Sequence, residues 1–162
     1  MTDALTTSDT DLLCIREAEK GDLPGVLALY AQPDLDDGVV LALHDAERIY
    51  ARFAHYPDYK LYIAEQDGRI VGTFALLIMD NLGHLGAPSA VIEDVVVGPV
   101  QQGRGIGRTM MKFAAARARD KHCYKLVLSS NAKRVRAHSF YEQLGFERHG
   151  YSFRVMLDEA TA

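Results

Sequence analysis

One stretch of the chain constrains the fold more than any other, because the spacing of its apolar residues changes along it. Residues 90–97 form a run rich in β-branched residues, and Gly98-Pro99 interrupts that run. From residue 105 to residue 121 the apolar residues recur at helical spacing, and residues 124–129 again resemble a strand. A strand, a crossover helix and a second strand in one sheet place the two strands parallel. The sequence therefore predicts one parallel strand pair joined through a helix.

The remaining segments predict antiparallel strands and further helices. Residues 59–65 and 69–79 flank Gln66-Asp67-Gly68, whose Asp-Gly pair favours a tight hairpin. Residues 12–17 predict a first strand, and residues 146–157 predict a final strand or hairpin. Helices are predicted over residues 22–30, 39–54 and 133–144, with Gly145 as the C-terminal cap of the last. We expect a mixed α/β fold, with a mostly antiparallel central sheet of six to seven strands flanked by about four helices.

Length and composition favour one globular domain. A chain of 162 residues with 48% hydrophobic and 25% charged residues is typical of a folded protein, so we expect one domain over residues 12–162 after a frayed segment at residues 1–11. No apolar stretch approaches the roughly 20 residues of a membrane helix. The start of the chain lacks the basic region and apolar core of a secretory signal. Cys14 and Cys123 suggest neither a disulfide framework nor a zinc site. A cytoplasmic protein is expected.

Charge is distributed unevenly along the chain. Residues 1–100 contain 6 Lys and Arg against 17 Asp and Glu, whereas residues 101–162 contain 12 against 5. A local basic block in an acidic chain suits a compact anion better than it suits a nucleic acid, which needs a broad basic face. Ordinary solvated helix faces would explain the imbalance equally well. The six histidines show no metal-ligand spacing, so no metal is expected.

A glycine-rich segment opens the helix of the predicted crossover. Val95-Val96-Val97 is followed, after the breaker, by Gln102-Gly103-Arg104-Gly105-Ile106-Gly107-Arg108. Glycines let the backbone approach a ligand closely, and the free N–H groups of a helix start can bind a pyrophosphate. No Gly-Lys-Ser/Thr follows, and the third glycine of the dinucleotide fingerprint would fall on Arg108. Taken alone, the segment also fits a plain turn into a helix.

The wider context makes the segment more specific. Three motifs in this order resemble the GNAT superfamily of acetyl-CoA-dependent N-acetyltransferases. They are Gln102-x-x-Gly105-x-Gly107, Ser129-Ser130-Asn131 and Phe140-Tyr141-Glu142-x-Leu144-Gly145-Phe146. Residues 92–97 with 123–126 are similar to glucosamine-6-phosphate N-acetyltransferases, whereas residues 131–141 look like aminoalkylphosphonate N-acetyltransferases. The resemblance covers nearly the whole chain. It implies the acyl-CoA N-acyltransferase fold and acetyl-CoA as co-substrate.

The resemblance also implies site residues. Tyr141 would protonate the departing thiolate, although a tyrosine beside Phe140 and Leu144 could instead belong to the core. Many members carry Asn seven residues before that tyrosine, whereas Arg134 stands there in this chain. The cofactor-binding role of that Asn is therefore given to Asn131. The side chain of Asn131 could instead serve only a turn. The expected cofactor-binding residues are Val95, Val96, Val97, Gln102, Gly103, Arg104, Gly105, Ile106, Gly107, Arg108, Asn131 and Tyr141.

A carboxylate is expected to act as the base. Strand alternation places Glu93 and Asp94 on opposite faces, and we select Glu93, acting through water, to deprotonate the amine. Asp94 is the competing candidate, and a structural Glu93 is an equal alternative. Tyr30, Tyr50 and Tyr56 could line the acceptor site or pack in the core. The expected reaction is direct acetyl transfer to a small primary amine. A protein lysine or N-terminus is the alternative acceptor, an idle acyl-CoA sensor is the alternative class, and a homodimer is possible.

Overall fold

The structure is a computed structural model that describes residues 12–33 and 35–157. Backbone contacts divide the chain after Leu128, into a first unit of residues 1–128 and a second unit of residues 129–162. The frayed segment predicted at residues 1–11 lies outside the described residues.

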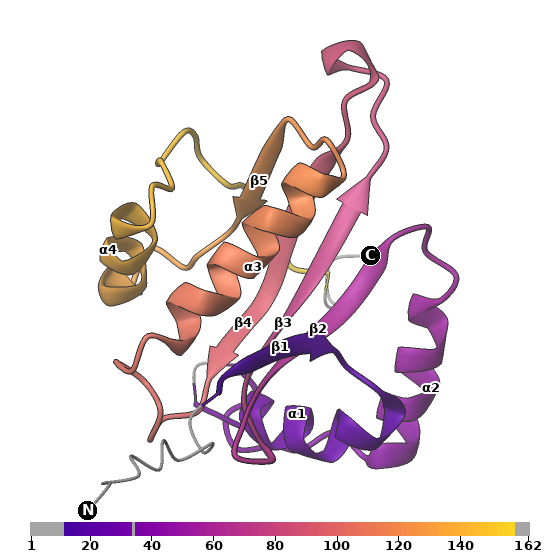
Figure 1. The fold of residues 1–162 in the computed structure, drawn as a ribbon, viewed down its shortest axis with the longest axis vertical. Coiled ribbons are helices and arrows are strands. Elements are labelled where there is room, and N and C mark those ends of the chain that lie inside the picture. Colours follow the sequence, from indigo (N-terminus) through magenta and orange to yellow (C-terminus); the bar gives the residue numbers. More distant parts are fainter. Residues whose placement is uncertain (1–11, 34, 158–162) are drawn as a thin grey trace, which may run out of the picture. The chain divides into compact units, whose positions relative to one another are not determined.

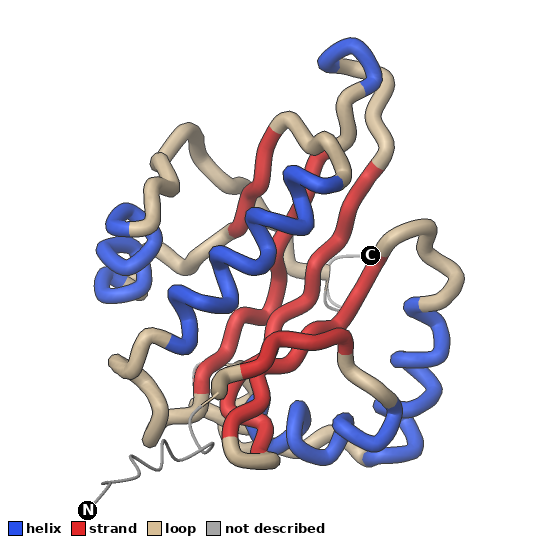
Figure 2. Tube along the Cα trace, in the orientation of Figure 1, coloured by secondary structure: helices blue, strands red, loops and turns tan. Residues whose placement is uncertain are grey.

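A sheet of five strands forms the centre of the first unit (Figure 1, Figure 2). In sheet order the strands are β1 (Cys14–Glu17), β2 (Tyr59–Gln66), β3 (Arg69–Met79), β4 (Ser89–Val97) and β5 (Lys125–Leu128). The first three neighbouring pairs are antiparallel, and β4 and β5 run parallel. The predicted parallel pair inside an otherwise antiparallel sheet is confirmed.

Helices α1 (Leu23–Tyr30), α2 (Leu43–Phe53) and α3 (Ile106–Asp120) belong to the first unit, and α4 (Val135–Gln143) belongs to the second. Two short 3-10 turns, η1 (Lys20–Asp22) and η2 (His84–Gly86), complete the described elements. Helix α2 begins at Leu43, later than the predicted start at residue 39. The β-branched side chains of Val39 and Val40 disfavour helix, and both are exposed, so no packing overrides that preference.

The turn between β2 and β3 confirms the predicted hairpin. Asp67 and Gly68 both have positive φ, at 51° and 69°. Two successive residues in this region form the turn whose twist matches that of the flanking strands. Glycine adopts the conformation at no steric cost, and aspartate is among the residues that tolerate it best. The local sequence therefore determines the connection of the two central strands.

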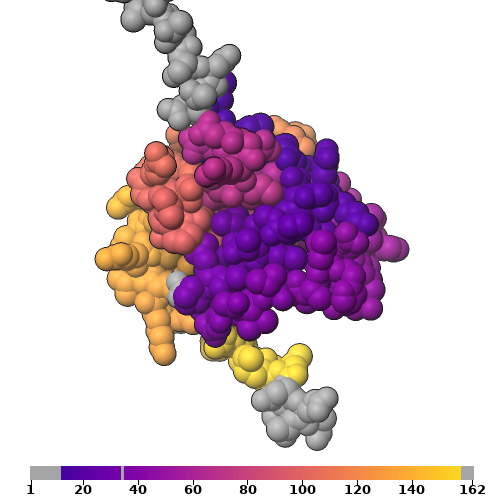
Figure 3. All heavy atoms as spheres, turned by 90° about the horizontal axis from the view of Figure 1, so that it is seen from below, coloured from indigo at the N-terminus to yellow at the C-terminus, as the bar shows by residue number. Residues whose placement is uncertain are grey.

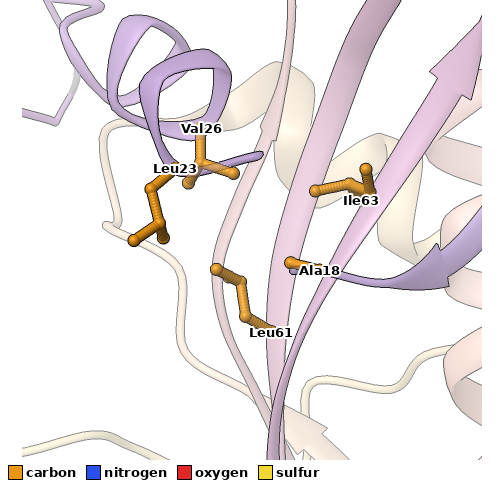
Figure 4. Close-up of a cluster of buried hydrophobic side chains, with 5 residues drawn as sticks. All are labelled: Ala18, Leu23, Val26, Leu61 and Ile63. Carbon is orange, nitrogen blue, oxygen red and sulfur yellow. The ribbon is translucent and has the colours of Figure 1, made fainter. Parts of the chain in front are cut away.

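One face of the sheet packs against α1. Side-chain alternation along β2 directs Leu61 and Ile63 to this face, where they form a buried cluster with Ala18, Leu23 and Val26 (Figure 4). The indigo and purple segment that contains α1 and α2 covers much of the first unit when it is viewed from below (Figure 3). Because the apolar side chains of α1 are held against the sheet, the end of α1 is fixed beside β3 and β4.

The opposite face packs against α3. Tyr62 of β2 stacks on Phe74 of β3 with ring centroids 5.3 Å apart, and Phe113 of α3 meets Tyr62 edge-on at 5.1 Å. Gly72 lets α3 approach closely, since a Cβ there would lie 2.7 Å from the sulfur of Met110 and 3.2 Å from the Val96 carbonyl oxygen. The start of α3 is thereby fixed near the end of β4.

The predicted strand count of six to seven is wrong, because the described residues form five strands. The missing element is the strand or hairpin predicted over residues 146–157, a segment that has neither helix nor strand up to Leu157. Its alternating Tyr151, Phe153 and Val155 have the pattern of a half-buried strand, yet all three are exposed. Alternation reports only a preference for a pleated surface, and a strand also needs a neighbour to accept its hydrogen bonds.

Candidate functional site

Strand β4 continues past the end of its parallel neighbour. Pairing with β5 ends where Ile92 meets Leu128, and β4 runs on to Val97. The N–H of Gly98 donates to the Val71 carbonyl in β3 at 2.8 Å, so the Val97 carbonyl, on the other side of that planar peptide, points away from β3. We call residues 93–97 the open edge of β4, because none of them pairs with β5. An edge of this kind can bind an extended, amide-containing ligand.

Two glutamine side chains cap the end of the open edge. The Val97 carbonyl accepts hydrogen bonds from Nε2 of Gln32 at 3.3 Å and from Nε2 of Gln102 at 3.2 Å. Gln102, a predicted cofactor residue, therefore contacts the backbone of Val97, another predicted cofactor residue. Gln32 follows α1 and was not predicted, since nothing in its local sequence indicates a contact with β4.

A β-bulge interrupts β4 at the predicted base. Thr73 of β3 pairs with Val96, and Ala75 pairs with Glu93, so Asp94 and Val95 together oppose Phe74. Asp94 has a positive φ of 51°. The bulge interrupts the regular alternation on which the prediction for Glu93 and Asp94 depended. Both carboxylates influence the same phenol, that of Tyr59.

The two carboxylates have raised pKa values. Burial raises the pKa of Glu93, and the nearby charge of Asp94 raises it further. Burial also raises the pKa of Asp94, and the charge of Asp36 adds to that rise. A carboxylate with a raised pKa is a better proton acceptor than an ordinary one at neutral pH. Asp36 lies between α1 and α2, and its participation could not be predicted from any motif.

Two tyrosines experience the charges of these carboxylates. Burial raises the pKa of Tyr30, at the end of α1, and the charge of Asp94 raises it further. Burial, Asp94 and Glu93, in that order, raise the pKa of Tyr59 at the start of β2. Both phenols therefore remain protonated and able to donate hydrogen bonds at neutral pH. Tyr59 was missed in the sequence, although its two-residue spacing from Leu61 places it on the α1 face.

A pocket of about 350 Å³ opens next to Tyr59, where α2, β1 and β2 meet. We call it the aromatic pocket; its lining includes Glu17, Tyr50, Phe53, Tyr56, Tyr59 and Lys60. Tyr50 donates a hydrogen bond to the Ala18 carbonyl, which gives this predicted acceptor-site residue a structural contact as well. Tyr56 is 53% exposed and can contact a ligand.

The glycine loop, residues 98–105, leads from the open edge into α3. Gly103 and Gly105 have positive φ values of 78° and 85°. A Cβ built on either glycine meets no atom within 4 Å, so a ligand can approach the backbone there. The first bond of the helix runs from the Thr109 N–H to the Gly105 carbonyl. The N–H groups of residues 106–108 accordingly have no acceptor within the helix and can bind an anion.

Exposed arginines accompany these N–H groups. Arg104 lies in the glycine loop and Arg108 in the first turn of α3, and both are exposed. Ile106 is buried and anchors the start of the helix. The arrangement combines N–H groups without a helical acceptor and exposed positive charge, which together suit a pyrophosphate. The predicted residues Val95 to Val97 lie at the end of β4, and the predicted residues Gln102 to Arg108 lie in the glycine loop and the first turn of α3. Both ranges belong to the first unit.

The second unit contains Asn131 and Tyr141. Oδ1 of Asn131 accepts a hydrogen bond from the Lys133 N–H at 2.9 Å, and its carbonyl lies 2.9 Å from Nε2 of His138. The Asn131 side chain therefore serves a turn, as the sequence alternative stated. Helix α4 ends at Gln143, one residue before the predicted end at Leu144, and Gly145, the predicted cap, has a positive φ of 88°.

The end of α4 holds the ring of Tyr141. The Gly145 N–H donates to Glu142 at 3.0 Å, and the Phe146 N–H donates to the Tyr141 carbonyl at 3.1 Å. Rings of Phe140 and Phe146 lie 5.1 and 5.7 Å from that of Tyr141. Burial raises the pKa of Tyr141, and Arg134 opposes the rise. The phenol is therefore a protonated donor at neutral pH.

Comparison with known proteins decides the family. Residues 15–146 match the model of the acetyltransferase (GNAT) family. The chain belongs to the GNAT family. Its α/β fold agrees: a solved Trypanosoma brucei acetyltransferase has a TM-score of 0.78 and 30% identity, over 90% of this chain and 100% of the other.

Curated relatives of the GNAT family point to N-acetyltransferases. A glucosamine 6-phosphate N-acetyltransferase of Trypanosoma brucei brucei is 37% identical over 60% of this chain and 65% of its own length. An aminoalkylphosphonate N-acetyltransferase of Salmonella typhimurium is 30% identical over 60% of this chain and 62% of its own length. The chain thus spans just under two thirds of the length of these two relatives. No helix among the described residues is long and apolar enough to cross a membrane.

Proposed function

We propose that this protein transfers an acetyl group from acetyl-CoA to the primary amine of a small molecule, by direct attack in a ternary complex. The observation that carries the proposal is the continuous run from Glu93 and Asp94, through the open edge of β4, into the glycine loop and α3. This run combines carboxylates, unpaired backbone groups and an anion site within sixteen residues, 93–108.

The glycine loop fits the pyrophosphate of acetyl-CoA as co-substrate. We assign the phosphates to the N–H groups at the start of α3 and to Arg104 and Arg108. The backbone of Val95 and Val96 is assigned to the amide-containing arm, since amides need both donors and acceptors. Val97 has a weaker claim, because its carbonyl already accepts bonds from Gln32 and Gln102. Gln102 belongs to this set through its bond to the Val97 carbonyl. Asn131 has a weaker claim, because its side-chain oxygen already accepts a bond from Lys133.

The reaction needs two proton movements. The amine nitrogen attacks the thioester carbonyl carbon, an N–C bond forms, and the C–S bond breaks. We assign the proton lost by the amine to Glu93, directly or through water, with Asp94 as the alternative; the raised pKa of each carboxylate supports the role. We assign protonation of the departing thiolate to Tyr141, whose phenol remains protonated at neutral pH.

Steady-state kinetics with a panel of amines tests this proposal. The full chain is mixed with acetyl-CoA and each amine, and thiol release is followed together with the mass of the acetylated product. Tyr141→Phe keeps the ring and removes the hydroxyl, so kcat should fall by roughly 10² while CoA affinity stays nearly unchanged. Tyr151→Phe is the matched control, because Tyr151 is 93% exposed and lies outside the motif.

Three outcomes separate the proposal from its alternatives. Acetylation of peptides but of no small amine would make the protein a lysine or N-terminal acetyltransferase. CoA binding without any acetylated product would make it a sensor. A Tyr141→Phe variant with the wild-type kcat would remove Tyr141 from the chemistry and leave the reaction itself standing. The cytoplasmic location and the homodimer remain predictions.

A further inference from the structure

We propose that the acceptor of this protein is a cationic amine with a ring-bearing or apolar body and no phosphate or phosphonate group. This inference rests on the proposed function, since it names the substrate class of the same site. It separates this protein from the two relatives above, whose names specify anionic acceptors. Two independent features carry it: the charges around β4 and the lining of the aromatic pocket.

The charges around the β4 bulge are acidic. The charge of Asp94 raises the pKa of Glu93, and both carboxylates raise the pKa of Tyr59. The charge of Asp36 raises the pKa of Asp94 and of Tyr30. The groups whose charges shift the pKa of these carboxylates and of Tyr30 and Tyr59 are carboxylic or phenolic, and a hydrogen bond with the neutral Thr73 side chain also acts on Tyr30. An anionic group placed here would meet like charges, whereas an ammonium would meet compensating ones.

The nearby lysine does not change this balance. Lys60 is the basic residue among the described residues that line the aromatic pocket, and its Nζ lies 3.0 Å from a carboxylate oxygen of Glu17. The Glu17 carboxylate thus neutralises the Lys60 ammonium. A phosphate bound in the pocket would have to compete with Glu17 for this ammonium. The pocket therefore offers an anion no unpaired cation from its own described lining.

The aromatic pocket suits a ring or an apolar chain. Phe53 stacks on Tyr59 with ring centroids 4.2 Å apart, and Tyr56 meets Tyr59 edge-on at 5.3 Å. A volume of about 350 Å³ lies within the usual range for small-molecule sites. Aromatic faces attract both apolar groups and ammonium ions.

Strand register connects the pocket with the carboxylates. Leu61 pairs with Ala75, and Ala75 pairs with Glu93, so all three side chains point to the α1 face. Tyr59 precedes Leu61 by two residues and shares this face. The ring of Tyr59 lines the pocket, and its hydroxyl experiences the charges of Asp94 and Glu93. An acceptor can therefore place its body in the pocket and its amine at the carboxylates.

A matched pair of acceptors tests the inference. Tyramine and tyramine O-phosphate share the ring and the amine and differ in the phosphate. We expect kcat/KM to be at least tenfold higher for tyramine, mainly through KM. Glucosamine and glucosamine 6-phosphate form a second pair, in which the unphosphorylated sugar should again be preferred.

Two variants locate the effect. Asp36→Asn removes one negative charge that acts on Asp94 and Tyr30, so KM for tyramine should rise several-fold while CoA affinity changes little. Tyr56→Ala removes an exposed ring of the pocket, and it should raise KM for tyramine but not for methylamine. Leu82→Ala, at a fully exposed side chain outside the pocket, is the control for Tyr56→Ala.

The outcomes distinguish this inference from the proposed function. A higher kcat/KM for either phosphorylated amine would overturn the inference and leave acetyl transfer intact. If no amine is acetylated, the proposed function fails, and calorimetric titration of the CoA complex with tyramine and its phosphate still decides the inference. Tighter binding of tyramine supports it; equal or weaker binding, or no binding of either, overturns it.

Discussion

Replacing Gly105 with alanine would test the backbone geometry of the glycine loop. Gly105 has φ 85° and ψ −1°, a left-handed conformation that costs an L-residue about 1–2 kcal/mol. The added methyl group would meet no atom within 4 Å, so no steric clash adds to this cost. The whole penalty therefore arises from the backbone conformation of one residue.

The penalty can appear in either of two measurements. If the loop of the Gly105→Ala variant keeps its conformation, the free energy of unfolding falls by about 1–2 kcal/mol and CoA affinity is unchanged. If the free loop relaxes instead, stability is retained and CoA must restore the strained conformation, which weakens binding by about 5- to 30-fold. The two losses should together amount to about 1–2 kcal/mol.

Urea denaturation and calorimetric titration with CoA measure the two terms. Gly21→Ala is the matched control, because Gly21 has no positive φ and a Cβ there also meets no atom within 4 Å. It corrects for the lower entropy that alanine gives the unfolded chain, about 0.4–1 kcal/mol. If Gly105→Ala differs from this control in neither stability nor CoA affinity, the loop does not need the left-handed conformation.

Two further predictions concern stability. Phe74 is fully buried and its ring centroid lies 5.3 Å from that of Tyr62, so Phe74→Ala should lower the free energy of unfolding by about 3–5 kcal/mol in urea; a loss below about 1 kcal/mol would contradict the packing described for α3. Two hydrogen bonds from Arg16, at 2.8 and 2.9 Å, lower the pKa of Asp22 below its ordinary 3.8. The stabilisation from Asp22 is therefore present above about pH 4 and is lost as pH falls through the lowered pKa, so Asp22→Asn should cost about 1 kcal/mol at pH 7 and progressively less in acid. Thermal unfolding from pH 7 to pH 2 measures the difference, and a constant difference would show that the ionised carboxylate is not its source.

The elements with strong local signals were predictable from the sequence. The Asp67-Gly68 turn, the helix from Ile106 and the Gly145 cap each depend on a conformation that the residues themselves prefer. The parallel β4–β5 pair followed from chain geometry once a helix was placed between two strands. These signals also located the open edge and the glycine loop, because both are consecutive in sequence.

The remaining parts depend on contacts between distant segments. The bulge at Asp94 arises from the pairing of β3 with β4, and the alternation within β4 gives no sign of it. The charges of Asp94 and Glu93 act on Tyr59, and that of Asp36 acts on Asp94, although these residues come from segments that are distant in the sequence. The strand predicted over residues 146–157 failed for the same reason, since pairing requires a partner that the segment does not itself encode.

The open edge of β4 also bears on aggregation. A strand edge without a neighbour can template the addition of another extended chain, and natural sheets protect such edges. Here the bulge at Asp94 and Val95 breaks the regular ladder, and Gln32 and Gln102 occupy the Val97 carbonyl. A second molecule would therefore find an irregular edge whose last acceptor already has two donors. The irregular backbone at Asp94 and Val95 thus helps keep separate molecules from joining their sheets.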